Sequence, residues 1–187
     1  MPAFDGAEGW GWVSRALHWS MAALILFQLG FGLYMTRVPD LLARFALTQT
    51  HKSWGTLVFA LAVVRVGWRL LNRRRPPLPP MPRWQVRAAE ASHGLLYGFM
   101  FVMPLSGWIM ASASPTQDLL QMQNMVFGVF PLPDPFVPGD PWVEAAAGAV
   151  HQAAAIGLAA VLALHAGAAL RHQFVDRDGL LARMLWS

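Results

Sequence analysis

The sequence predicts an all-α membrane protein, a bundle of four transmembrane helices with both termini in the cytoplasm. Three observations predict it. Of the 187 residues, 56% are hydrophobic and only 13% are charged, whereas a soluble domain carries about 25% charged residues. Four apolar segments each approach the roughly 20 residues that cross a bilayer. Finally, most basic residues fall in segments that would share one side of the membrane. We expect residues 1–187 to form one domain.

The first two spans are expected at residues 16–35 and 53–71. No small-residue cleavage site follows the first segment and further spans come after it, which favours a retained helix over a signal peptide. The second segment is interrupted by Arg65 and Arg69. An arginine inside a span requires an anionic partner or a position from which it can reach the interface.

The other two spans are expected at residues 93–112 and 145–170. The third contains Pro104, a kink that neighbouring helices can tolerate, and the fourth contains no charged residue. Residues 113–144 form the longest connection, rich in proline, glycine and acidic residues. We interpret it as an external loop that either docks a partner or covers a site.

The distribution of charge gives the orientation. Eleven of the 14 basic residues fall on one side if the chain crosses four times. They are Arg15, Arg65, Arg69, Arg73, Arg74, Arg75, Arg83, Arg87, Arg171, Arg177 and Arg183. The positive-inside rule places this side, and with it both termini, in the cytoplasm, which predicts a multi-pass membrane protein. Because the basic residues flank spans, topology explains the net charge better than nucleic-acid binding does. The absence of cysteine excludes disulfides, iron–sulfur ligation and covalent haem attachment.

Two histidines stand near the ends of the fourth span, in the stretch VHQAAAIGLAAVLALHAG (residues 150–167). His151 and His165 are 14 residues apart, so they share a helix face to within about 40° and differ in depth by about 21 Å. With four spans, His18 lies at the depth of His165 and His51 at that of His151. The histidines therefore form two pairs, one per leaflet: the inner pair, His18 and His165, at the cytoplasmic side, and the outer pair, His51 and His151, at the external side.

Opposed imidazoles on facing helices of a bundle are a standard way to hold haem iron. The pairs His18–His165 and His51–His151 thus predict two haems stacked along the fourth span, with small residues between His151 and His165 leaving room for the macrocycles. Both axial positions of each iron would be filled, which favours electron transfer over dioxygen binding. A structural zinc site needs about four close ligands, which two separated pairs do not supply.

Arginines near the inner pair fit the same interpretation. Arg65 follows His51 by 14 residues, so it faces similarly about 21 Å deeper, and Arg15 stands one turn before His18. Each is a candidate partner of a haem propionate, although Arg65 and Arg69 can also reach the interface. His172 is a candidate to bind a propionate, relay a proton or contact a quinone; simple interfacial anchoring is the alternative for it and for His93.

Several motifs together resemble the bacterial cytochrome b561 family. They are SRALHW (14–19), HKSWG (51–55), RVGWRLLNRRRPPLP (65–79), HGLLYGFMFVMPLSGW (93–108) and the spacing of His151, His165 and His172. The likeness extends over about residues 14–184 and is poorest at 115–144. It implies four transmembrane helices and two non-covalent b haems ligated by the four paired histidines.

The resemblance also implies electron transfer between quinone and a partner across the membrane. Some similar proteins are superoxide oxidases, which reduce ubiquinone, and others are cytochrome b subunits of hydrogenase or dehydrogenase complexes. Lys52 adjoins His51, with Arg37 and Arg44 in the same external segment, and this cluster would attract a small anion such as superoxide; a lysine here can equally mark the membrane boundary. The sequence thus favours a superoxide:quinone oxidoreductase with Lys52, His172 and Arg171 as candidate substrate-site residues. A subunit of a larger complex and a haem-free scaffold are the alternatives.

Overall fold

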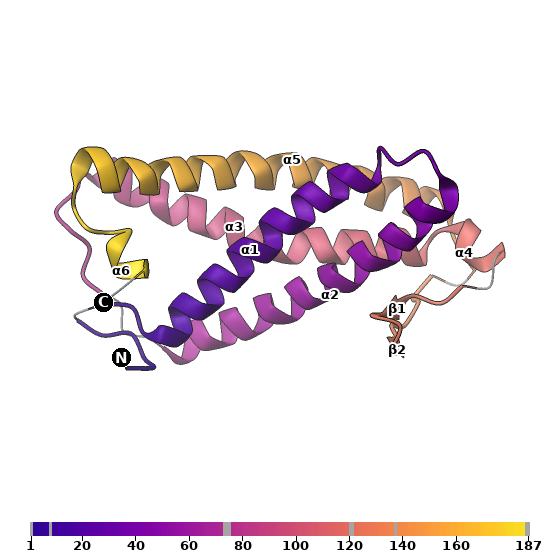
Figure 1. The fold of residues 1–187 in the computed structure, drawn as a ribbon, viewed down its shortest axis with the longest axis horizontal. Coiled ribbons are helices and arrows are strands. Elements are labelled where there is room, and N and C mark those ends of the chain that lie inside the picture. The colour runs from indigo at the N-terminus through magenta and orange to yellow at the C-terminus, as the bar shows by residue number, and fades with distance from the viewer. Residues whose placement is uncertain (1, 8, 73–75, 120–121, 137, 186–187) are drawn as a thin grey trace.

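Four long helices dominate the computed structural model, which describes residues 2–7, 9–72, 76–119, 122–136 and 138–185. The helices run side by side (Figure 1) and are α1 (Trp12–Met35), α2 (Leu41–Leu71), α3 (Arg83–Ser112) and α5 (Pro141–Arg171). Each is long and apolar enough to cross a membrane. The predicted four-span all-α bundle is therefore confirmed. Arg73, Arg74 and Arg75 of the predicted basic loop lie outside the described residues.

All four long helices begin earlier than hydropathy alone predicts, α1 at Trp12 instead of residue 16. α2 begins at Leu41 because the Asp40 carboxylate caps it by accepting from the Ala43 amide at 2.7 Å. α5 likewise begins directly after Asp140, which accepts from the amides of its first turn, and α3 begins after Pro82. The apolar windows mark only the segment that crosses lipid, whereas an aspartate cap sets where α2 and α5 start.

The packing order of the helices places α5 against α3, α3 against α2, and α2 against α1, with the α3–α5 contact the most extensive. Small residues of α5 explain that close approach. A Cβ at Gly157 would lie only 2.6 Å from the Phe99 ring, and one at Gly148 would lie 3.3 Å from the Met110 sulfur. At both positions a side chain of α3 occupies the space. Of the two, only Gly157 lies between His151 and His165, where small residues are predicted to leave room for macrocycles, and there the Phe99 ring takes the space instead.

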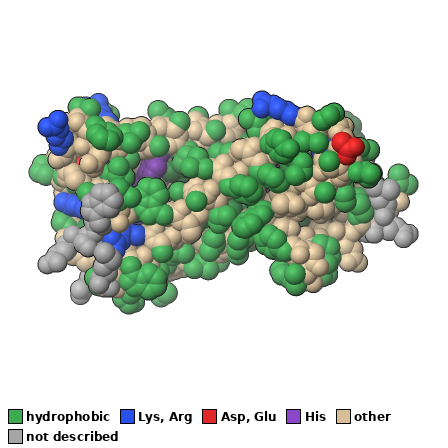
Figure 2. All heavy atoms as spheres, in the orientation of Figure 1, with side chains coloured by type: hydrophobic (Ala, Val, Ile, Leu, Met, Phe, Trp, Pro, Cys, Tyr) green, Lys and Arg blue, Asp and Glu red, His purple; other side chains and the backbone are tan. Residues whose placement is uncertain are grey.

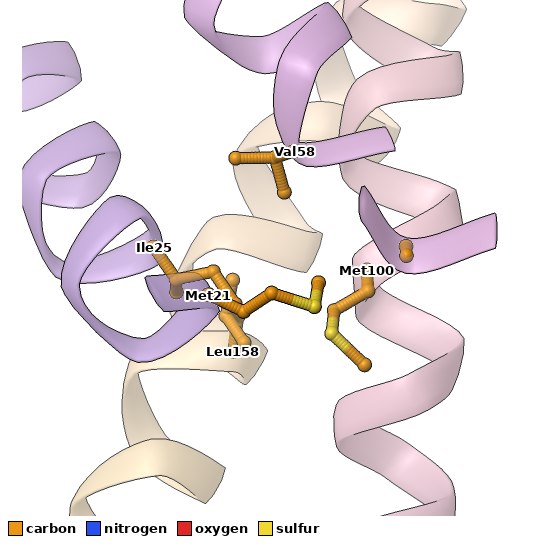
Figure 3. Packing of buried hydrophobic residues seen from close by; sticks show 6 residues of the cluster. Met21, Ile25, Val58, Met100 and Leu158 are labelled. Atoms are coloured by element: carbon orange, nitrogen blue, oxygen red, sulfur yellow. The ribbon is translucent and has the colours of Figure 1, made fainter. Parts of the chain in front are cut away.

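A compact apolar cluster occupies the middle of the bundle. Met21, Ile25, Val58, Ala62, Met100 and Leu158 form it, and Met21 of α1 reaches towards Met100 of α3 (Figure 3). Leu158 lies seven residues from both His151 and His165. The cluster therefore separates the two depths at which the predicted histidine pairs lie.

The segment between α3 and α5 folds into short elements. It contains α4 (Pro115–Leu119) and a hairpin of β1 (Met125–Val126) and β2 (Phe130–Pro131), paired antiparallel. The hairpin is fixed to α2, since the Phe127 amide donates to Ser53 Oγ at 2.9 Å. The Trp108 indole of α3 also donates to the Pro133 carbonyl at 2.9 Å. This loop is thus folded onto the bundle.

Both chain ends lie at the same end of the bundle, opposite α4 and the hairpin (Figure 1). After α5, the chain continues as η1 (His172–Asp176) and α6 (Ala182–Leu185). The Trp19 indole donates to the Met184 carbonyl at 2.8 Å, which fixes the tail to α1. On the face drawn in Figure 2, charged side chains gather towards the two ends and hydrophobic side chains cover the length between them, the distribution of a membrane-spanning bundle.

Candidate functional site

Four histidines from three helices meet in two pairs. His151 and His165 both lie on α5. The ring centre of His151 lies 6.3 Å from that of His51 on α2, and the ring centre of His165 lies 6.2 Å from that of His18 on α1. The structure therefore brings together the pairs that helix periodicity predicts. Their ligation of iron stays a prediction.

The spacing within each pair fits a shared iron. Two imidazoles that bind one metal from opposite sides through metal–nitrogen bonds of about 2 Å hold their ring centres about 6 Å apart. The separations of 6.2 and 6.3 Å match this value. In the described part of the chain no group of three or more histidine, cysteine or acidic residues could hold a metal ion by itself. Paired imidazoles are thus the donor set that this bundle offers.

Glycines make room for both rings of the outer pair. A Cβ built on Gly32 of α1 would lie 3.2 Å from Cε1 of His51, and one on Gly107 of α3 would lie 3.1 Å from Cε1 of His151. Both distances are tighter than ordinary contacts of a Cβ. Any larger residue at either position would press on the ring, so these glycines allow the imidazoles to occupy their present positions.

His151, the α5 member of the outer pair, is oriented by α3. Nδ1 of His151 lies 2.9 Å from the carbonyl oxygen of Met103. A carbonyl only accepts, so Nδ1 carries the proton and Nε2 is left with its lone pair. Metal-bound histidines almost always use their second nitrogen in this way. By contrast, Nδ1 of His51 is buried without a hydrogen-bond partner among the described residues.

Arg65 holds the inner pair from α2. Its guanidinium donates to the Leu17 carbonyl at 3.2 Å and to the Tyr97 hydroxyl at 3.3 Å, and it lies 3.1 Å from Nδ1 of His18. Arginine has no acceptor, so His18 accepts at Nδ1 and carries its proton on Nε2. Ligation of iron through Nε2 excludes this contact, because the proton would then sit on Nδ1. Iron binding therefore requires the Arg65 donor to find another acceptor.

A third histidine lies at the inner pair, one for which helix periodicity predicts no partner. The His93 ring of α3 lies 5.2 Å from the His165 ring, inclined by 66°. One turn further along α3, Tyr97 lies beneath the guanidinium of Arg69, whose Cζ is 5.5 Å from the ring centre. The signal available in the sequence is the spacing of four residues between His93 and Tyr97, which places both on one helix face.

Lys52 is hydrogen-bonded by the loop between α3 and α5, which is predicted to be external. Its ammonium donates to Asn124 Oδ1 at 2.5 Å, and the Asn124 amide group in turn donates to the Asp134 carboxylate. Asn124 is 3% exposed. Sequence reasoning places Lys52 beside His51 but misses Asn124, because nothing in the local pattern distinguishes it from the other polar residues of the loop.

His172 and Arg171 lie beyond the inner pair, where α5 passes into η1. Nδ1 of His172 lies 2.6 Å from Asp178 and 3.4 Å from Asp176, and Nε of Arg171 lies 3.5 Å from Asp176. Arg177 closes this turn in the left-handed conformation, with φ of 52°. Two of the predicted substrate-site residues, His172 and Arg171, thus contact the carboxylates of Asp176 and Asp178. Arg15, one turn before His18, is buried at 7% exposure.

A family model described as prokaryotic cytochrome b561 matches residues 9–187. The chain belongs to this family. It is 30% identical over 179 residues to cytochrome b561 homolog 2 of Escherichia coli (strain K12), covering 95% of this chain and 92% of that protein. It is 32% identical over 143 residues to cytochrome b561 homolog 1 of the same organism, covering 74% of each chain.

Family membership confirms the resemblance drawn from the motifs. As a prokaryotic cytochrome b561, the protein is a bacterial membrane electron-transfer protein, and the family implies b-type haem. The paired histidines fit that group by their spacing, by the glycines against the outer rings and by the oriented tautomer of His151. Residues 115–144, where the motifs of the family are poorest, form the loop whose contacts with Lys52, Ser53 and Trp108 come from the structure of this cytochrome b561.

Proposed function

We propose that this cytochrome b561 binds two b haems and transfers electrons from superoxide, at the end of the bundle with the external loop, to ubiquinone in the membrane. The proposal rests on two histidine pairs near the two ends of α5. His165 faces His18 with ring centres 6.2 Å apart, and His151 faces His51 with ring centres 6.3 Å apart. A single pair would allow one haem and no relay across the bilayer. Two pairs, separated by the apolar cluster that contains Met21 and Leu158, provide two haem sites between which an electron can pass.

His51 with His151, and His18 with His165, would hold the two haems, which would supply one-electron oxidation and reduction. Each superoxide loses one electron and becomes dioxygen. Two such electrons with two protons convert one quinone to quinol. The remaining tasks of binding, steering and proton supply belong to residues of this chain.

At the outer end, the Lys52 ammonium provides the positive charge that attracts superoxide. Its hydrogen bond to Asn124 fixes it against the loop, one residue along α2 from His51, instead of leaving it on a flexible side chain in solvent. The nearby Asp134 reduces the attraction. The loop thereby positions the charge and also moderates it.

At the inner end, Arg65 and Arg15 are the candidate partners of haem propionates. Arg65 must exchange its contact with His18 for another acceptor when iron is ligated, and an anionic propionate accepts its donors more strongly than an imidazole does. Leu17 and Tyr97 hold the guanidinium in place on its other side. His93 packs on His165 and keeps that ring oriented.

Quinone reduction is assigned to the region of His172 and Arg171. The hydrogen bond of His172 Nδ1 to Asp178 leaves Nε2 as the nitrogen that can face a quinone oxygen. An imidazole backed by a carboxylate can pass a proton in the direction of the reduced quinone. We propose that this end of the bundle, which also carries both termini, faces the cytoplasm of a bacterial inner membrane.

The deciding experiment is a reduced-minus-oxidised absorbance spectrum of the purified protein with a haem count. We expect two b-type haems per chain. Replacing His151 with alanine should remove the outer haem alone, and replacing His165 should remove the inner one alone. No b-type signal would indicate a haem-free protein, and retention of both haems in both variants would overturn the pairing.

The substrate assignment has its own test. The isolated protein, supplied with superoxide and a soluble ubiquinone analogue, should form quinol faster than the uncatalysed reaction and release dioxygen. If two haems are present but superoxide-dependent quinol formation stays at background, the protein acts instead as an electron-transfer subunit of a larger complex.

A further inference from the structure

An uncharged hairpin projects from the external loop. Residues 125–133, MVFGVFPLP, contain no charged side chain and no polar side chain. The chain turns between β1 and β2 at Phe127 and Gly128, both with positive φ. Phe127 is 49% exposed, Val129 77% and Phe130 51%. Apolar side chains gathered on an exposed turn require a partner surface.

The contacts of the hairpin place it beside α2 and not beyond the helix ends. Ser53 Oγ accepts from the Phe127 amide and lies 3.4 Å from the Met125 carbonyl. The Phe127 ring also meets the Trp54 ring edge to face at 5.3 Å. Ser53 and Trp54 are two and three residues further into the bilayer than His51. The turn therefore lies at the depth of the outer histidine pair, alongside the bundle (Figure 1).

The hairpin also continues the lipid-facing surface of α1 and α2. Trp54 contacts Phe27 of α1 at 5.8 Å, and Phe27 stacks on Phe31 at 5.2 Å. Phe27 is 44% exposed although it lies well inside a candidate span, so lipid covers its open side. Phe127 thus extends a row of aromatic rings that already faces the bilayer, and aromatic residues are favoured at the membrane interface.

The polar residues of the loop lie at the base of the hairpin. Asn124 precedes β1 and joins Lys52 to Asp134, and its carbonyl accepts from the Leu132 amide at 2.7 Å. The loop is therefore amphipathic, with a hydrogen-bonded base beside the outer pair and an apolar tip. That division is typical of a segment that lies in a membrane interface.

We propose that the hairpin tip, residues 127–130, inserts into the adjacent bilayer leaflet, so that lipid is the partner of this surface. Insertion holds the hairpin from two sides, by Ser53, which bonds the backbone of Met125 and Phe127, and by lipid around the exposed side chains of the tip. It closes the lipid-facing flank of the outer pair. The proposal does not depend on haem or on the substrate.

The chain contains no cysteine, so single cysteines report on chosen positions in the otherwise unchanged protein. Val129→Cys carries a nitroxide spin label at the tip. Ile156→Cys, 68% exposed on the middle of α5, is the lipid-facing reference. Thr116→Cys, exposed on α4, is the aqueous reference. Each protein is placed in phosphatidylcholine–phosphatidylglycerol vesicles, and relaxation of the label by dioxygen, which concentrates in lipid, is compared with relaxation by a water-soluble nickel chelate.

We expect the label at 129 to be relaxed by dioxygen several times more strongly than by the nickel chelate, as at 156 and opposite to 116. A label at 129 that the nickel chelate relaxes as strongly as at 116 would place the tip in water and overturn the proposal. Weak relaxation by both reagents, with or without spin–spin broadening, would mean that protein covers the tip, from a second copy or a partner, and would overturn it equally.

Discussion

The guanidinium of Arg65 lies 3.1 Å from Nδ1 of His18, a contact that joins α2 to α1 at the inner histidine pair. Arg65 also holds Tyr97 of α3 through its Nε. One side chain thereby ties three helices together at the depth of the proposed inner haem. Its positive charge lies where a reduced iron centre would be stabilised, since reduction adds a negative charge.

Replacing Arg65 with glutamine should lower the reduction potential of the inner haem. A charge interaction of about 1 kcal/mol corresponds to about 40 mV for one electron, so we expect a decrease of tens of millivolts in a potentiometric titration. Arg65→Lys keeps the charge and should retain most of the potential. Arg44→Gln, exposed at the far end of α2, is the matched control. An equal shift of both haems would contradict the assignment of Arg65 to the inner one.

Gly107→Ala should cause loss of the outer haem. The new Cβ would press on Cε1 of His151 at 3.1 Å, which displaces the ring from its hydrogen bond to Met103. We expect the haem count to fall from two towards one per chain, with the inner haem retained. Gly98→Ala on the same helix is the control, because no atom lies within 4 Å of its Cβ position. Equal haem content in the two variants would show that the ring does not need this space.

His93→Ala should alter the inner haem without removing it. The His93 ring supports the His165 ring at 5.2 Å, so its loss frees the axial imidazole to rotate. The electron paramagnetic resonance signal of a low-spin ferric haem depends on the angle between its two axial rings, and the inner signal should shift. His93→Phe keeps an aromatic ring and should restore it. Leu95→Ala, at an exposed position of α3, should leave the signal unchanged, and a shift there would indicate general loosening of the helix.

Lys52→Gln should slow the reaction with superoxide several-fold and weaken its dependence on ionic strength, because an attractive charge at the outer pair is lost. Stopped-flow measurement of haem reduction by superoxide at two salt concentrations tests this. Arg87→Gln makes the same change of charge at an exposed position near the opposite end and should have little effect. Identical salt dependence in the wild-type protein and Lys52→Gln would remove Lys52 from the path of the anion.

Periodicity is sufficient to predict much of this protein. Spans follow from apolar runs of known length, and residues 14 apart on a helix share a face at two depths. For that reason the spacing of His151 and His165, together with the four-span topology, matches His151 with His51 and His165 with His18. The basic residues near the span ends predict the orientation by the same one-dimensional reasoning.

Other features could not be predicted because they arise between helices. His93 meets His165, and Asn124 meets Lys52, only because helix packing and the loop bring residues 72 positions apart into contact. No local pattern encodes such a distance.

The spans, their apolar character and the depths of the histidines can be read from the amino-acid order alone, because they depend on spacing along single helices. The space around the rings cannot, because it depends on how the helices pack. The glycines of α5 are suited to macrocycles by their size, yet side chains of α3 fill the space at Gly157 and Gly148. The room at the outer rings comes instead from Gly32 and Gly107 on the facing helices. Whether a helix needs a small residue on a given face depends on which helix packs against that face. That arrangement follows from the tertiary packing and not from the spacing within one helix.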